Sequence, residues 1–115
     1  MKIKMVSKFL FVCSGNTDRS PTAEELVNKV KGVEVKSAGT SLSARTNISK
    51  ELTDWADYIL AMEKYHREYI VNRWPESENK IRVLNIKDRY ARNSPELIKL
   101  LKKKISKFLQ ELFSD

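Results

Sequence analysis

The chain has 115 residues, of which 41% are hydrophobic and 32% charged, and its 22 Lys and Arg against 15 Asp and Glu give a net charge of +7. This length is typical of one domain with a substantial core, so residues 1–115 are expected to form a single domain. No apolar stretch approaches the roughly 20 residues that cross a membrane, and Met1 to Ser7 does not resemble a secretory signal. We therefore expect a cytoplasmic protein with no membrane partner. The chain has one cysteine, which excludes an internal disulfide.

The first predicted element is a strand over Lys8 to Val12, whose apolar run is typical of a strand buried on both faces in a parallel sheet. The loop Cys13-Ser14-Gly15-Asn16-Thr17-Asp18-Arg19-Ser20 follows. A helix is expected from Ser20 to Lys31, with Pro21 in its first turn and Gly32 at its end. Its apolar stripe consists of Ala23, Leu26, Val27 and Val30. A strand, a glycine-containing loop and a helix in this order direct backbone N–H groups and the helix dipole at one point, which predicts an anion site.

Strands and helices continue to alternate along the rest of the chain. The expected segments are a short edge strand at Val33–Lys36, a loop at Ser41–Lys50, a helix at Lys50–Ala56, a strand at Tyr58–Met62, a helix at Glu63–Arg73, a turn at Trp74–Asn79, a strand at Ile81–Leu84 and a loop at Asn85–Asn93. Ser94 and Pro95 are expected to cap and open a closing helix with an apolar stripe of Leu97, Ile98, Leu101, Ile105, Phe108, Leu109 and Leu112. The pattern predicts an α/β fold, a three-layer sandwich of a four-stranded parallel sheet flanked by helices, with a phosphate-binding loop after the first strand.

Cys13 and Arg19 would face one anion from the two ends of this loop. Backbone N–H groups from Ser14 to Arg19 would hold the equatorial oxygens of a phosphate group, and the guanidinium of Arg19 would bind two of them. Cys13 would attack phosphorus in line and form a phosphocysteine without a metal or cofactor. The same positive field favours the thiolate of Cys13. The alternative is a buried, inert thiol.

Three segments resemble one family, the low-molecular-weight protein tyrosine phosphatases. Phe11 to Glu24 is similar to that family's active-site signature, Val35-Lys36-Ser37-Ala38-Gly39-Thr40 to its second landmark, and Ala56 to Met62 to a third. The resemblance implies one phosphatase domain over residues 1–115 and hydrolysis of phosphotyrosine through a phosphocysteine. It implies that Cys13 is the nucleophile, Arg19 the phosphate clamp, Ser20 a hydroxyl that steadies the thiolate, and Asn16 a loop residue held by Ser37. The expected phosphate-binding residues are Ser14, Gly15, Asn16, Thr17, Asp18, Arg19 and Ser20.

The leaving oxygen needs a proton donor from another loop, and Asp88 is the expected general acid. Residues 85–90 resemble the family's acid loop; Tyr90 matches and is expected at the substrate, but Arg89 replaces the usual Pro. A surface Asp88 paired with Arg89 or Arg92 is the alternative, and Asp54, Asp57 and Glu63 are weaker candidates for the acid.

The chain departs from the family in two further ways. It is shorter after Thr40, and Asp18, expected to point outward, replaces a second cysteine. His66, the only histidine, is expected on the surface.

Two other functions remain open at this stage. One is a non-catalytic module that binds a phosphoprotein or RNA, and the other is a phosphatase of a small phosphorylated metabolite. The positive charge is concentrated late in the chain, at Lys99, Lys102, Lys103, Lys104 and Lys107. These lysines fit the polar face of a helix and have no interleaved aromatic residues, so nucleic acid is a less favoured partner than a phosphotyrosine protein or another phosphomonoester.

Overall fold

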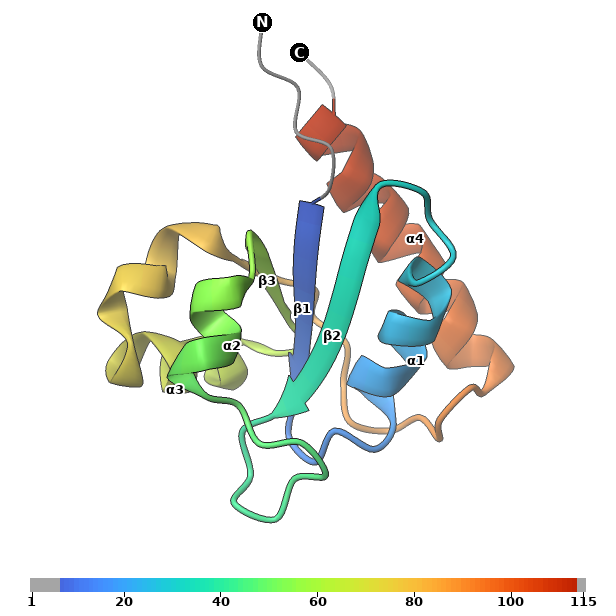
Figure 1. The fold of residues 1–115 in the computed structure, drawn as a ribbon. Helices are drawn as coiled ribbons and strands as arrows, with labels where there is room; N and C mark the ends of the chain where they lie inside the picture. Colours follow the sequence, from blue (N-terminus) through green and yellow to red (C-terminus); the bar gives the residue numbers. More distant parts are fainter. Residues whose placement is uncertain (1–6, 114–115) are drawn as a thin grey trace, which may run out of the picture.

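The computed structural model describes residues 7–113, and its centre is one sheet of four parallel strands (Figure 1). The strands are β1 (Ser7–Cys13), β2 (Val33–Gly39), β3 (Tyr58–Ala61) and β4 (Ile81–Val83). Their order is β2-β1-β3-β4, so β1 lies in the interior and pairs with both β2 and β3. The predicted α/β fold and parallel sheet are confirmed.

Helices cover both faces of this sheet, as expected. Figure 1 shows α1 (Arg19–Val27) and α4 (Pro95–Phe113) on one face, and α2 (Lys50–Trp55) with α3 (Lys64–Arg73) on the other. A 3-10 helix, η1 (Pro75–Lys80), connects α3 to β4.

Side chains of β1 alternate between the two layers. Phe9 and Phe11 join the core beneath α1 and α4, whereas Leu10 and Val12 join the core beneath α2 and α3. All four of these side chains are fully buried, which fixes the register of the strand that carries Cys13 at its end.

Helix α1 is shorter than predicted, and β2 is longer. The helix ends at Val27 rather than Lys31, and Val30, expected in the apolar stripe, is 39% exposed. The chain turns back at Gly32, whose φ of 82° favours glycine and whose carbonyl oxygen accepts a hydrogen bond from Ser7 N–H. Strand β2 then stays paired with β1 until Gly39 lies opposite Cys13, which places the second landmark beside the phosphate loop.

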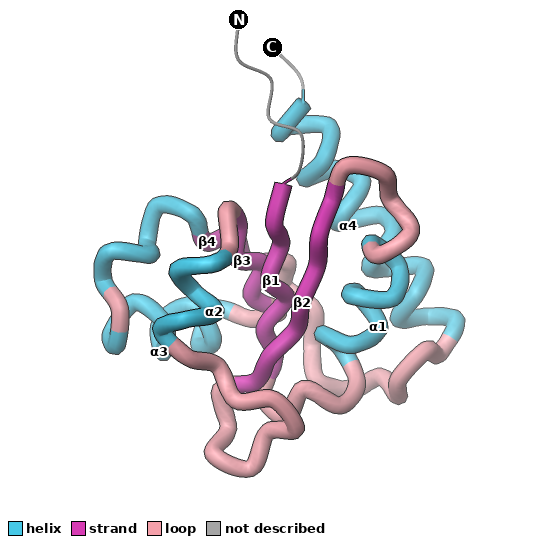
Figure 2. The backbone as a smooth tube through the Cα atoms, in the orientation of Figure 1, coloured by secondary structure: helices cyan, strands magenta, loops and turns pink. Residues whose placement is uncertain are grey.

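The loops that follow the strands meet at one edge of the sheet (Figure 2). They are residues 14–18 after β1, residues 40–49 after β2 and residues 84–94 after β4, and the N-terminus of α3 follows β3 directly. This is the edge at which parallel sheets bind ligands. Within residues 7–113, no helix combines the length and the hydropathy needed to span a membrane.

Candidate active site

A small cavity of about 180 Å³ lies at this edge of the sheet. It is lined by Cys13, Ser14, Gly15, Thr17, Asp18, Arg19 and Asp88. Six of these residues come from the loop between β1 and α1, and Asp88 reaches the cavity from the loop after β4. The structure therefore brings the predicted nucleophile, clamp and acid together around one space.

Cys13 is held by a hydroxyl behind the loop. Its Sγ lies 3.0 Å from Ser20 Oγ, and Ser20 Oγ accepts a hydrogen bond of 2.9 Å from Asn16 Nδ2. Because that bond uses a lone pair of Ser20, the hydroxyl hydrogen can be donated to the sulfur, an arrangement that stabilises a thiolate. Ser20 is fully buried and does not line the cavity, so it acts on the sulfur and not on a bound phosphate.

Asn16 shapes the loop from the inside. Its φ of 56° lies in the left-handed region, which asparagine adopts more readily than most residues. Its side-chain amide donates to Ser20 Oγ and to Ser37 Oγ, each at 2.9 Å, and Ser37 donates in turn to Glu24 Oε1. The structure thus links Asn16 to Ser37, while Asn16 itself is fully buried and absent from the cavity wall.

Arg19 is fixed in place before any ligand binds. Its side chain is 2% exposed, and Nη1 donates to Glu63 Oε2 at 2.5 Å and to the carbonyl oxygen of Ile86 at 2.8 Å. Nη2 lies 3.8 Å from Asp88 Oδ2 on the open side of the cavity. Two of its partners come from different loops, so the guanidinium has little freedom to turn away from the cavity.

The charge of Arg19 is also secured. Burial disfavours it, but hydrogen bonds to Glu63 and Tyr65 and the negative charges of Asp88 and Cys13 outweigh this effect, so the pKa of Arg19 is raised. Glu63, which sequence analysis treated only as a weak candidate for the acid, is therefore the main partner of the clamp. The signal available in the sequence was its position directly after a buried strand.

His66 is not a surface residue, and that prediction was wrong. Its side chain is fully buried, and Nδ1 accepts a hydrogen bond of 3.0 Å from Glu63 N–H. The ring hydrogen must then be on Nε2, which donates to Ser14 Oγ at 2.9 Å. The Tyr65 hydroxyl is 3.0 Å from the same oxygen. The first turn of α3 thus holds the start of the phosphate loop through His66 and its end through Glu63 and Arg19.

Three further predicted residues lie in different settings. Asp18 lines the cavity, although it was expected to point outward, and its Oδ1 accepts a hydrogen bond from Arg92 N–H. Asp88 is 64% exposed and is directed at Arg19 rather than buried in a pair with a surface arginine. Tyr90 packs against the core beneath α1 and α4 and is not among the residues that line the cavity, so the structure does not bring it to the phosphate position.

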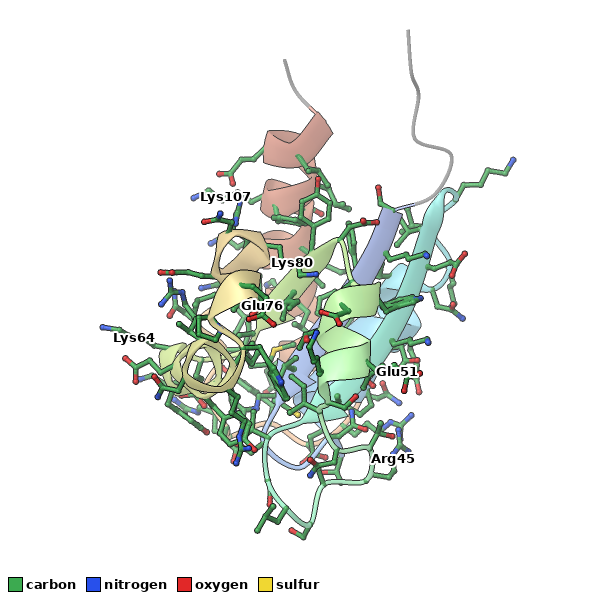
Figure 3. All side chains as sticks on the ribbon, turned by 60° about the vertical axis from the view of Figure 1, so that its left-hand side comes forward. Arg45, Glu51, Lys64, Glu76, Lys80 and Lys107 are labelled. Atoms are coloured by element: carbon green, nitrogen blue, oxygen red, sulfur yellow. The ribbon has the colours of Figure 1, made fainter. Side chains whose placement is uncertain are left out.

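The short loop after β2 supports the phosphate loop from below. Thr40 N–H donates to the Cys13 carbonyl, Ser41 N–H to the Ser14 carbonyl at 2.9 Å and Arg45 N–H to the Gly15 carbonyl at 3.1 Å. Arg45 is labelled on this loop in Figure 3. Although the segment is shorter than the resemblance implies, it still braces three consecutive residues of the site.

The environment of His66 gives a pH-dependent stability that can be measured. Burial, and then the charge of Arg19, lower the pKa of His66 to about 4, although Glu63 and Asp88 oppose the shift. In the unfolded chain its pKa is about 6.5. Between these values the unfolded chain binds more protons, so stability falls as the pH falls, by about 3 kcal/mol at pH 4.

We expect this loss to disappear in His66→Gln, which can still donate a hydrogen bond to Ser14. Urea titrations at pH 7.5 and pH 4 would measure the free energy of unfolding of both proteins. The advantage of the wild type over the variant should shrink by about 3 kcal/mol at the lower pH. A pH-independent difference would show that His66 does not lose its neutral state on unfolding.

Together, a buried strand ending in Cys13, a phosphate-sized loop closed by Arg19 and a carboxylate across the cavity define a cysteine-dependent phosphatase fold and site. The family model described as low molecular weight phosphotyrosine protein phosphatase matches residues 8–48. A protein-arginine-phosphatase from Geobacillus stearothermophilus is 38% identical over 100 residues, covering 66% of this chain and 68% of that protein. The chain therefore belongs to the low molecular weight phosphotyrosine protein phosphatase family.

Solved structures agree with this assignment. The YwlE arginine phosphatase from Geobacillus stearothermophilus has a TM-score of 0.70 at 30% identity and covers 95% of this chain and 98% of its own. The tyrosine phosphatase Wzb from Escherichia coli K30, solved in complex with phosphate, has a TM-score of 0.77 at 24% identity and covers 94% of this chain and 99% of its own. The second likeness supports the fold alone.

Proposed function

We propose that this protein removes phosphate from phosphorylated protein side chains through a phosphocysteine on Cys13. The observation that carries the proposal is the single cavity shared by Cys13, Arg19 and Asp88. Residues 1–115 would act as one phosphatase domain. A cytoplasmic location is part of the proposal, because a reducing compartment keeps a lone thiol active.

In the first step, Cys13 Sγ attacks phosphorus, and the bond from phosphorus to the leaving atom breaks as Asp88 gives that atom a proton. Arg19 and the loop N–H groups hold the equatorial oxygens as their charge changes. In the second step, water attacks the phosphocysteine, Asp88 takes its proton, and the phosphorus–sulfur bond breaks. Inorganic phosphate leaves, and the thiolate is restored.

The amino acid that carries the phosphate has two candidates. Phosphoarginine is favoured by the two relatives that are named arginine phosphatases and are 38% and 30% identical to this chain. Phosphotyrosine, the expectation from sequence, is favoured by the family whose model matches residues 8–48. Either one fits the mechanism, since Asp88 would protonate the guanidine nitrogen or the phenolic oxygen.

Phosphate release from matched phosphoarginine and phosphotyrosine peptides tests the proposal and ranks these substrates. We expect turnover of at least one peptide, with inhibition by vanadate, which shares the shape of the transferred group. Tight phosphate binding without turnover of either peptide would instead support the non-catalytic phosphate-binding module. Turnover of small phosphorylated metabolites alone would contradict the protein substrate.

The role of Asp88 predicts a dependence on the leaving group. In Asp88→Asn, hydrolysis of phenyl phosphate should fall by about 10²- to 10³-fold, because its basic leaving oxygen needs the proton. Hydrolysis of 4-nitrophenyl phosphate should fall far less, since 4-nitrophenolate leaves without one. A panel of substituted aryl phosphates would measure the slope of rate against leaving-group pKa for both proteins. An equal loss across the panel would remove Asp88 from the acid role.

A further inference from the structure

Two further cavities extend from the phosphate cavity along the loop that carries Asp88. The nearer one has a volume of about 410 Å³ and is lined by Glu63, Lys64, Tyr65, Glu68, Asn85 and Lys87. The farther one has a volume of about 260 Å³ and lies between the end of β4 and α4, lined by Arg82, Val83, Leu84, Asn85, Lys104, Lys107, Phe108 and Glu111. Asn85 lines both cavities, so they meet at this residue.

The three cavities are close enough to form one path. Asp88 lines the phosphate cavity, Lys87 the nearer cavity, and Asn85 both the nearer and the farther one. Each residue extends a chain by at most about 3.5 Å, so Asn85 and Asp88 are separated by no more than about 10 Å. An extended peptide whose phosphorylated residue occupies the phosphate cavity would reach the farther cavity within three to six residues.

The farther cavity has a cationic wall and an apolar base. Arg82 comes from β4, while Lys104 and Lys107 are one turn apart on α4, and one carboxylate, that of Glu111, also lines the space. The guanidinium of Arg82 donates to the carbonyl oxygens of Asn79 and Ile81, which carry no net charge. Lining side chains thus contribute three positive charges and one negative charge.

Both lysine-bearing helices present this face to the same side of the molecule. In Figure 3, Lys64 on α3 and Lys107 on α4 lie on the left-hand side of the view. Val83, Leu84 and Phe108 supply apolar surface beneath the charges of the farther cavity. A ligand with carboxylates and some apolar atoms would match this combination, as an acidic stretch of polypeptide does.

We propose that the two cavities form a docking groove for the polypeptide that flanks the phosphorylated residue, and that Arg82, Lys104 and Lys107 bind acidic side chains three to six residues away from it. The inference rests on the proposed function, because the flanking segment belongs to the same substrate. A polypeptide is favoured over a single-stranded nucleic acid as the occupant. The aromatic residue of the farther cavity, Phe108, is buried and offers no face on which a base could stack.

A charge-reversed groove would test this. The variant Lys104→Glu/Lys107→Glu alters the groove, and Lys99→Glu/Lys103→Glu makes the same change of charge on exposed positions of the same helix that do not line the cavity. Each protein would be assayed with a phosphopeptide carrying Asp and Glu three to six residues from the phosphorylated residue, with its Asn and Gln counterpart, and with an aryl phosphate.

We expect the KM of the acidic peptide to rise about tenfold in the groove variant and to change less than twofold in the control variant. The KM values of the neutral peptide and of the aryl phosphate are the references and should move little in either variant. Equal KM values for the acidic peptide in all three proteins would overturn the groove. An equal rise in both variants would show only an effect of net charge and would also overturn it.

Failure of the proposed function can be told apart from failure of the groove. If the wild type hydrolyses none of the substrates, the proposed function fails, and fluorescence anisotropy still measures binding of the labelled acidic phosphopeptide to each protein. Binding that is weakened only by Lys104→Glu/Lys107→Glu would then support the groove. Binding of a single-stranded RNA oligonucleotide that is weakened by this variant, with no effect on the peptide, would assign the surface to nucleic acid and overturn the proposal.

Discussion

Cys13→Ser is expected to lower the hydrolysis rate by at least about 10⁴-fold while leaving phosphate binding almost unchanged. A serine hydroxyl holds its proton far more tightly than a thiol, and the structure places no general base beside it: the near neighbour of the sulfur, Ser20 Oγ, is itself a hydroxyl. Arg19 and the loop amides that would bind phosphate are not altered by the change. Steady-state rates and isothermal titration with phosphate or vanadate would measure the two effects separately.

The single cysteine makes the control for this experiment direct. Iodoacetate should add one carboxymethyl group to the wild type and none to the variant, and phosphate should slow that addition, since Cys13 lines the phosphate cavity. Mass spectrometry counts the modification. More than about 1% residual activity in Cys13→Ser, with no trace of wild-type protein, would contradict a phosphocysteine mechanism.

Gly39→Ala is expected to have the second largest effect, although Gly39 does not line the cavity. A Cβ atom at this position would lie 2.4 Å from the Ser14 carbonyl oxygen, 2.7 Å from Ala44 Cβ and 3.0 Å from Asn16 N. The Ser14 carbonyl is held by Ser41 N–H, so it cannot retreat without breaking the brace beneath the site. We expect a loss of about 2–3 kcal/mol in the free energy of unfolding and a fall in kcat/KM of at least about 100-fold.

Gly15→Ala provides a matched control for the stability measurement. The nearest atom to a Cβ at this position is Thr17 Oγ1 at 3.5 Å, an ordinary contact, so the expected loss of stability is below about 1 kcal/mol. Thermal and urea unfolding of the two variants would give the comparison. If Gly39→Ala were as stable and as active as the wild type, the tight approach of β2 to the phosphate loop would not be a requirement of the site.

The parts of the fold with strong local signals were predictable from the sequence. The apolar run of β1 and its loop could be placed because strand, glycine and helix-opening Pro21 follow one another directly. Ser94 and Pro95 correctly marked the start of α4, where Leu97 N–H donates to Ser94 Oγ. The end of α1 was predicted wrongly because helical periodicity continued to Val30, while the turn at Gly32 toward β2 is imposed by the sheet.

The supporting residues of the site were not predictable in the same way. His66 contacts Ser14 across 52 positions of sequence, and Glu63 contacts Arg19 across 44. Each lies in a charged helical stretch whose local pattern favours solvent exposure, and only the docking of α3 against the phosphate loop buries them. Tyr90 shows the opposite error, because a match to a motif placed it at the substrate whereas the core takes up its ring.

The brace beneath the phosphate loop is made by main-chain atoms of Thr40, Ser41 and Arg45 alone. Backbone amides are present whatever residue occupies a position, proline excepted, so this support constrains the length and path of the segment more than its composition. Natural or engineered variation at residues 42–46 can therefore change the outer rim that an incoming substrate meets, while the chemistry beneath it stays intact. New selectivity can arise here without rebuilding the catalyst.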